Sequence, residues 1–162
     1  MKKALLILSF GTGILSAQTS TFITDGDWLD PANWDTGAVV PDNQTAFINA
    51  NAVVDRNTGN ANVDNPSRIE IGSGPGISGS VTVTGGTLSG AHGGGNGIFV
   101  GVNGGTGTLR VEEGATYRSQ GGTMQFAVGD FLGGTGFVSV AGVMQIYKFL
   151  NVNNGTFEMM PT

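Results

Sequence analysis

Apolar and polar residues alternate in a series of short segments along the second half of the chain. Ile69 and Ile71, for example, flank Glu70, and the same alternation runs through residues 107–111. A period of two places successive side chains on opposite faces of a β-strand. Valine, isoleucine, phenylalanine and threonine, which suit a half-buried pleated surface, fill most of these positions. The pattern therefore predicts an all-β protein made of short strands.

The alternating segments return at a nearly fixed interval. The glycines that end one recurring phrase are 29 and 28 residues apart, and the valines that end another are 28 and 29 residues apart. The glycines are Gly72, Gly101 and Gly129, and the valines are Val83, Val111 and Val140. Two phrases that keep one period indicate a repeat protein. Gly-rich stretches between the phrases, such as residues 104–107, are typical of tight turns.

Equivalent positions in successive repeats carry similar side chains, which distinguishes two topologies. A sandwich pairs strands that are neighbours in sequence, whereas a solenoid pairs each strand with its counterpart one repeat later. The predicted stacks are Ile71–Val100–Val128, Ile69–Ile98–Phe126 and Val81–Leu109–Val138. Val53, 28 residues before Val81, is expected to extend the last stack. The sequence predicts a right-handed parallel β-helix (β-solenoid) of about four coils over residues 47–162, rising about 4.8 Å per coil.

Residues 1–17 have the layout of a secretory signal. Lys2 and Lys3 form a basic start before an apolar run that is too short for a permanent membrane span. Ser16 and Ala17 supply small residues for cleavage. Removal of this segment leaves 12 acidic and 5 basic residues, a net charge of −7. Such a charge disfavours nucleic acid binding, which needs a basic patch. No other apolar stretch is long enough to span a membrane, so no membrane anchor is expected.

Residues 18–46 combine five aspartates with both tryptophans of the chain, Trp28 and Trp34. The ends of a solenoid expose unpaired strands and an apolar column, which aggregate unless they are covered. We expect this segment to form an N-terminal cap whose tryptophans close the first coil. Alternatively, Trp28 or Trp34 is an exposed platform for a sugar ring.

The other end of the predicted stack has no polar helix or aromatic loop to cover it. Three alternatives follow for its apolar surface. It is exposed, it docks on a partner or on further repeats, or the chain is a truncated version of a longer repeat protein.

The N-terminal segment and the repeats occur in a distinctive combination. Residues 26–34, with the sequence Gly-Asp-Trp-Leu-Asp-Pro-Ala-Asn-Trp, precede repeats of the form Phe-Val-Gly-x-Asn-Gly-Gly-Thr-Gly-Thr-Leu-x-Val. This combination resembles the secreted autotransporter-like β-helix proteins of Gram-negative bacteria, many of which end in a PEP-CTERM sorting tail. The sorting tail itself is absent from this sequence. The resemblance implies an exported protein of the cell surface or matrix, without assigned catalysis.

Few residues suggest catalysis or metal binding. His92 is the only histidine, and it lies in a Gly-rich corner without neighbours that would orient it as a base. One histidine and no cysteine leave too few ligands for a zinc site. Glu112 and Glu113 are adjacent on a predicted strand, so they face opposite sides unless a bulge intervenes. The glycine strings lack the following helix that would hold a phosphate.

Calcium is the best metal candidate, because it prefers about six to eight oxygen ligands and the N-terminal segment is rich in carboxylates. The candidate ligands are Asp25, Asp27, Asp30 and Asp35. Their spacing is not that of an EF-hand, since Leu29 stands where Asp or Asn is expected.

These observations favour an exported, non-enzymatic β-helix that serves as a surface, matrix or adhesin-like structural module and needs no cofactor. We expect it to be secreted or to lie on the surface of a Gram-negative bacterium. Extracellular polysaccharide, other surface components or further copies at the open end are its expected partners. The alternative is a carbohydrate-binding or polysaccharide-degrading β-helix, for which Trp28, Trp34 and the acidic composition argue.

Overall fold

A computed structural model describes residues 19–41, 44–55, 66–90, 97–119, 125–130, 132–146 and 149–161. The predicted signal segment 1–17 and His92 lie outside the described residues. The first strands are β1 (Thr19–Phe22), β2 (Gly26–Asp27), β3 (Thr45–Ile48) and β4 (Asn51–Asp55), with a 3-10 helix η1 (Pro31–Asn33) after β2. The middle strands are β5 (Arg68–Ser73), β6 (Ser78–Gly85), β7 (Thr87–Gly90), β8 (Gly97–Val102), β9 (Thr106–Val111) and β10 (Thr116–Ser119). The last strands are β11 (Gln125–Val128), β12 (Thr135–Val140), β13 (Val143–Gln145), β14 (Phe149–Val152) and β15 (Gly155–Met159).

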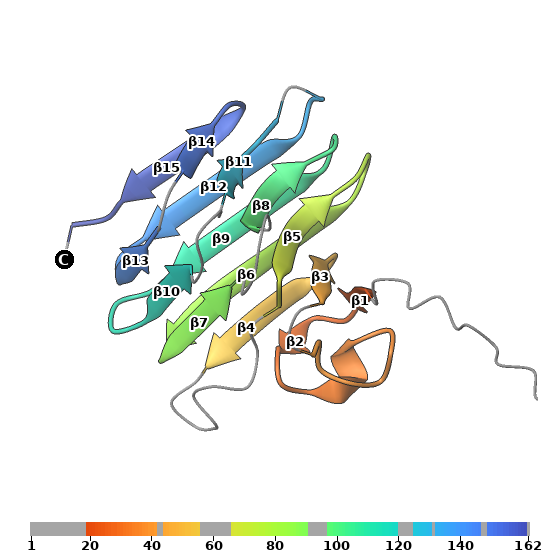
Figure 1. The fold of residues 1–162 in the computed structure, drawn as a ribbon. Coiled ribbons are helices and arrows are strands. Elements are labelled where there is room, and N and C mark those ends of the chain that lie inside the picture. Colours follow the sequence, from red (N-terminus) through yellow and green to blue (C-terminus); the bar gives the residue numbers. More distant parts are fainter. Residues whose placement is uncertain are drawn as a thin grey trace, which may run out of the picture.

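The strands form three parallel sheets. Within the sheets the strands are stacked coil on coil, from β1 and β2 at one end to β14 and β15 at the other (Figure 1). Sheet 1 has the order β1-β3-β5-β8-β11-β14, sheet 2 the order β2-β4-β6-β9-β12-β15 and sheet 3 the order β7-β10-β13. Each strand pairs with its counterparts in the neighbouring coils and not with its neighbours in sequence. The chain is therefore a parallel β-solenoid of about four coils, as the repeat predicts.

The register confirms the predicted stacking of like side chains. In sheet 1, Ile71 pairs with Val100 and Val100 with Val128. The stacks Ile69–Ile98–Phe126 and Val81–Leu109–Val138 also form, and all nine residues are at most 1% exposed. Together they line the apolar column between the sheets. The alternation of residue types thus determines which side chains face inward.

The expected stacking of Val53 under Val81 is wrong by one residue. Ala52 pairs with Val81, and Val53 pairs with Thr82 on the outer face. Val53 is accordingly 41% exposed, whereas Val54 is 1% exposed and faces the column. Because Val53 and Val54 are both valines, the sequence does not show which of them faces the column. The pairing of β4 with β6 also has an irregular register just after Val54.

The stack of strands begins inside the segment expected to be a cap. β1 pairs with β3, and β2 pairs with β4, so residues 19–22 and 26–27 already belong to sheets 1 and 2. Strand pairing thus reaches back beyond the predicted boundary at residue 46. Residues 28–41 belong to the connection between β2 and β3 and include both tryptophans.

The corner between sheets 1 and 2 brings backbone against backbone. Gly72, Gly101 and Gly129 have φ values of +60°, +63° and +68°, which favour glycine. A Cβ atom on Gly101 would overlap the carbonyl oxygen of Thr135 in the next coil. On the facing strands, a Cβ on Gly107 would overlap the carbonyl oxygen of Ile71. The glycine repeat therefore has two causes, positive φ and the absence of space for a side chain.

The two causes can be separated by substitution. Gly101→Ala should prevent folding or lower stability by more than about 4 kcal/mol, because the methyl group would overlap backbone that cannot move alone. Gly114→Ala is the matched control, since Gly114 also has a positive φ (+79°) but nothing within 4 Å of the added Cβ. It should cost only about 1 kcal/mol in chemical denaturation. Equal losses in the two variants would contradict the close-packed corner.

Tyr117 places a hydroxyl group inside the apolar column. It stacks between Leu88 and Met144 in sheet 3, and its ring packs edge-on against Phe126 at 5.8 Å between centroids. The residue is fully buried, and its Oη atom has no hydrogen-bond partner in the part of the chain that the structure describes. Burial raises the pKa of the phenol well above its ordinary value, so the group stays neutral. An unpaired buried hydroxyl destabilises the folded state.

Removing that hydroxyl should stabilise the protein. We expect Tyr117→Phe to raise the free energy of unfolding by about 1 kcal/mol, because the ring packing is kept and the unpaired polar atom is lost. Tyr117→Leu, which also removes the ring, should lower it by roughly 2 kcal/mol. Thermal and chemical denaturation measure both changes. A lower Tm for Tyr117→Phe would mean that the hydroxyl has a partner.

Candidate functional site

The two tryptophans do not form a sugar platform. Trp28 and Trp34 are 0% and 2% exposed, so neither presents a ring face to a ligand. Their centroids lie 5.0 Å apart with the rings nearly perpendicular, and Phe22 packs edge-on against Trp34 at 5.2 Å. Trp34 Nε1 donates a 2.8 Å hydrogen bond to the carbonyl oxygen of Trp28. The platform interpretation is wrong, because the rings bury one another near the start of the column.

The four calcium candidates accept hydrogen bonds within the protein, and two of them form local turns. Asp27 accepts a hydrogen bond from the Leu29 amide, and Asp30 accepts one from the Ala32 amide at the start of η1. Each is a side-chain bond to the backbone two residues on, as in an Asx turn. Asp35 accepts a 2.8 Å bond from the amide nitrogen of Thr21.

Asp25 binds a neighbouring coil instead. Its two oxygens accept hydrogen bonds of 2.8 Å from the backbone nitrogen and from the side-chain amide of Asn51. The bond from the Asn51 backbone, and then that from its side chain, lower the pKa of Asp25. Within the described residues, which include all four aspartates, no three His, Cys, Asp or Glu side chains come together to hold a metal. The structure therefore does not assemble the carboxylates that a calcium site would need.

The acidic pair at the end of β9 lies at a shallow hollow of about 470 Å³. Arg110, Glu112 and Glu113 line it, together with Ser139 and Met160. All three charged residues are exposed. A catalytic acid or base needs a setting that orients it, and exposure to solvent leaves both carboxylates free to rotate. The hollow therefore carries no argument for catalysis.

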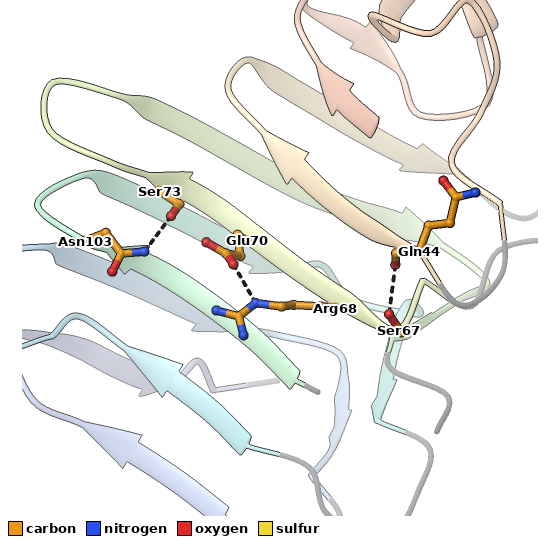
Figure 2. Close-up of polar contacts among 6 residues, drawn as sticks. All are labelled: Gln44, Ser67, Arg68, Glu70, Ser73 and Asn103. Carbon is orange, nitrogen blue, oxygen red and sulfur yellow. Dashed lines mark hydrogen bonds and ion pairs between the residues drawn. The ribbon is translucent and has the colours of Figure 1, made fainter. Parts of the chain in front are cut away.

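A polar cluster that the sequence analysis did not single out lies on the outer face of sheet 1. Arg68 and Glu70 in β5 are two residues apart and therefore project from the same face. Arg68 Nε contacts Glu70 Oε1 at 2.5 Å (Figure 2). The Arg68 guanidinium carbon also lies 4.0 Å from the centroid of the Phe99 ring. A guanidinium over an aromatic face contributes a cation–π attraction. We call Arg68, Glu70 and Phe99 the outer cluster.

Glu70 is buried although it faces outward. Its side chain is 7% exposed, compared with 33% for Arg68. The pairing register explains this burial. In the row of outward-facing residues that runs across the strands of sheet 1, Phe47 of β3 precedes Glu70 and Phe99 of β8 follows it. The two phenylalanines flank the carboxylate, and Arg68 supplies the charge that compensates it.

A groove of about 280 Å³ begins beside the outer cluster and lies over β11. Its lining includes Arg68, Phe99, Asn103, Gln125, Ala127 and Asn153. Figure 2 shows Asn103 pointing toward Ser73, whose Oγ accepts a 3.0 Å bond from Asn103 Nδ2. The same view shows Ser67 tied to Gln44, whose carbonyl oxygen accepts bonds from the Ser67 amide and hydroxyl at 2.8 and 3.2 Å. These bonds fix sheet 1 on both sides of the outer cluster. We call the groove over β11 the outer groove.

Part of the signal for the outer cluster is present in the sequence, because Glu70 and Phe99 are 29 residues, one repeat, apart. A charged residue between two inward-facing isoleucines, with phenylalanine at the equivalent outer position one coil away on each side, predicts a covered charge. The equivalence of Phe47 with Glu70 spans only 23 residues, shorter than the repeat, so it is visible only once the register is known.

Comparisons with family models, with curated proteins and with solved structures found no match. In the described part of the chain, no helix has the length and apolar composition needed to cross a membrane.

The ion pair in the outer cluster predicts a coupled effect on stability. Arg68→Met should lower the free energy of unfolding by about 2 kcal/mol, because it leaves the buried Glu70 carboxylate without a counter-charge. Adding Glu70→Gln to Arg68→Met should recover much of that loss, giving a positive coupling in a double-mutant cycle. Arg110→Met, on an exposed position of β9, is the control and should change stability by less than about 0.5 kcal/mol. Additive effects of the two substitutions would rule out the pair.

Proposed function

We propose that the chain is a non-enzymatic structural module of an exported surface or matrix protein that acts by contact through its rigid outer faces. The observation that carries the proposal is the in-register repetition of polar side chains on sheet 2. Asn51, Ser80 and Thr108 occupy equivalent outer positions of consecutive strands. Neighbouring strands repeat every 4.7–4.9 Å or so, which gives a regular row of hydrogen-bonding groups.

Asn51 and Ser80, two of the three residues in this row, are held by hydrogen bonds. Ser80 Oγ hydrogen-bonds to Asn51 Oδ1 at 2.7 Å, and Asn51 is bound in turn by Asp25. Ordered side chains lose less conformational entropy when they bind a partner. A row of similar weak sites also favours partners that are themselves repetitive, because several contacts then form together.

The far end of the stack supports a role in assembly. In the last coil, Leu150 and Val152 continue the inward stacks of Phe126 and Val128, yet each is 43% exposed. Met159, which follows Val140, is 62% exposed. The outer edges of β14 and β15 are unpaired within the described residues. Unpaired strands beside apolar side chains accept further strands, either from more repeats or from a second copy.

Export is part of the proposal and is supported by the signal-like layout of residues 1–17 and by the resemblance to secreted β-helix proteins. Carbohydrate binding is the second candidate function. The buried tryptophans no longer support it, but the outer groove does, because it combines an aromatic wall with several polar side chains.

The test uses the full chain produced in a Gram-negative host. The chain should leave the cytoplasm with residues 1–17 removed, as fractionation and mass spectrometry would show. Beads coated with the exported protein should then be retained on a biofilm of that host at least about a hundredfold more strongly than the soluble protein, because only the beads bind multivalently. The soluble protein should release no sugar products from the biofilm polysaccharide.

A matched pair of variants locates the contact. Ser80→Glu with Thr108→Glu places adjacent charges on sheet 2 and should abolish retention, whereas Thr87→Glu with Thr116→Glu, adjacent on sheet 3, should not. Cytoplasmic retention of the uncleaved chain would overturn export. Release of sugar products would overturn the non-enzymatic role, and equal effects of the two pairs would overturn the assignment of the contact to sheet 2.

A further inference from the structure

We propose that the outer groove binds a short segment of a neutral polysaccharide. The inference rests on the second candidate function, carbohydrate binding, and assigns it a site and a ligand class. It is independent of the contact proposed for sheet 2, because the groove lies on the outer face of sheet 1.

The groove exists because the outer row of sheet 1 loses side-chain volume at β11. Along this row, Phe99 in β8 is followed by Ala127 in β11 and then by Asn151 in β14. Gly129, at the corner just after β11, has no side chain and also lines the groove. Ala127 is 5% exposed and forms the floor, with the larger side chains on either side.

The walls offer an apolar surface and hydrogen-bond donors together. Phe99 is half-buried and supplies the aromatic wall. Arg68 lies over this ring with its Nε atom bound to Glu70, and its terminal nitrogens point away from Glu70 (Figure 2). The guanidinium retains N–H donors in a planar fork that can bind two vicinal hydroxyl oxygens.

The charged groups at the groove are already compensated. Glu70 neutralises Arg68 across a 2.5 Å contact. Asp130 accepts hydrogen bonds from three backbone amides, those of Asn103 at 2.5 Å, Leu132 at 3.1 Å and Gly134 at 2.9 Å. Its oxygens are therefore used to hold the corner between sheets 1 and 2.

The remaining polar groups are uncharged amides. Gln125 stands at one end of β11, and Asn153 lies just after β14. Asn103 donates through Nδ2 to Ser73, which leaves its Oδ1 atom as an acceptor at the groove. Amide groups bind hydroxyls as both donors and acceptors. With a net charge of −5 on the whole chain, a polyanion is disfavoured and a neutral, hydroxyl-rich ligand is preferred.

The size of the groove limits the ligand. The four residues of β11 extend over about 13 Å at roughly 3.3 Å per residue, and a volume of about 280 Å³ is at the lower end for small-molecule sites. The site therefore fits one or two sugar units of a longer chain. We expect weak binding, with a Kd on the order of 1 mM, which is useful only when many sites act together.

The experiment titrates the folded full chain with hexasaccharides of β-1,4-glucan, α-1,4-glucan and β-1,4-mannan, and with hexagalacturonate, by NMR. At least one neutral hexasaccharide should bind, and more tightly than hexagalacturonate. Phe99→Leu should weaken that binding about tenfold, the equivalent of one aromatic contact. Phe137→Leu is the matched control, because Phe137 is an exposed phenylalanine on the outer face of β12 in sheet 2. It should leave the affinity unchanged.

A second variant keeps the test decisive if Phe99→Leu fails to fold. Ala127→Met fills the floor of the groove without removing a contact, and it should abolish binding while the melting curve stays cooperative. The inference is overturned if no neutral hexasaccharide binds, if hexagalacturonate binds more tightly, or if Phe137→Leu weakens binding as much as Phe99→Leu. None of these outcomes affects export or the retention of coated beads, so the proposed structural role fails or stands separately.

Discussion

The architecture depends on the contact of backbone with backbone at the corner between sheets 1 and 2. The glycines at both sides of this corner leave no space for a Cβ atom, as the positions of Gly101 and Gly107 show. The apolar column is more tolerant, since the equivalent inward positions hold valine, leucine or isoleucine without loss of register. Volume-conserving exchanges in a core cost little, whereas backbone overlap cannot be relieved by a change of rotamer. In the middle coils the spacing of Gly72, Gly101 and Gly129 therefore matches the coil length, 29 and then 28 residues.

Much of the fold could be predicted from sequence because a parallel solenoid places its contacts at a constant separation along the chain. Ile71 and Val100 are 29 residues apart, and the repeat alone is enough to pair them. The prediction failed where the local pattern was ambiguous. Val53 and Val54 are both apolar, so only the register shows that Val54 faces inward.

The candidate site was far less predictable than the fold, because residues with chemical potential serve structural purposes here. Asp27 and Asp30 bind backbone amides in local turns, and Trp34 donates to a backbone oxygen inside an aromatic cluster. Composition cannot distinguish such roles from ligand binding, since the same carboxylate or indole serves either. Burial and hydrogen-bond partners decide, and both depend on contacts between coils.

The outer face of a solenoid is best understood along its rows, across the strands, rather than along the chain. Each row holds one side chain per coil, at a constant spacing, so any change in side-chain size becomes a step in the surface. In the row that contains Glu70, the change from Phe99 to Ala127 is such a step, and the outer groove lies there. The same row buries Glu70 between two phenylalanines, which is why the arginine beside it is fixed in place. One irregular row thus accounts for both the outer cluster and the groove. Phe99 and Ala127 are 28 positions apart, so the repeat is enough to pair them, whereas Phe47 and Glu70 are 23 positions apart and only the register shows that they are neighbours.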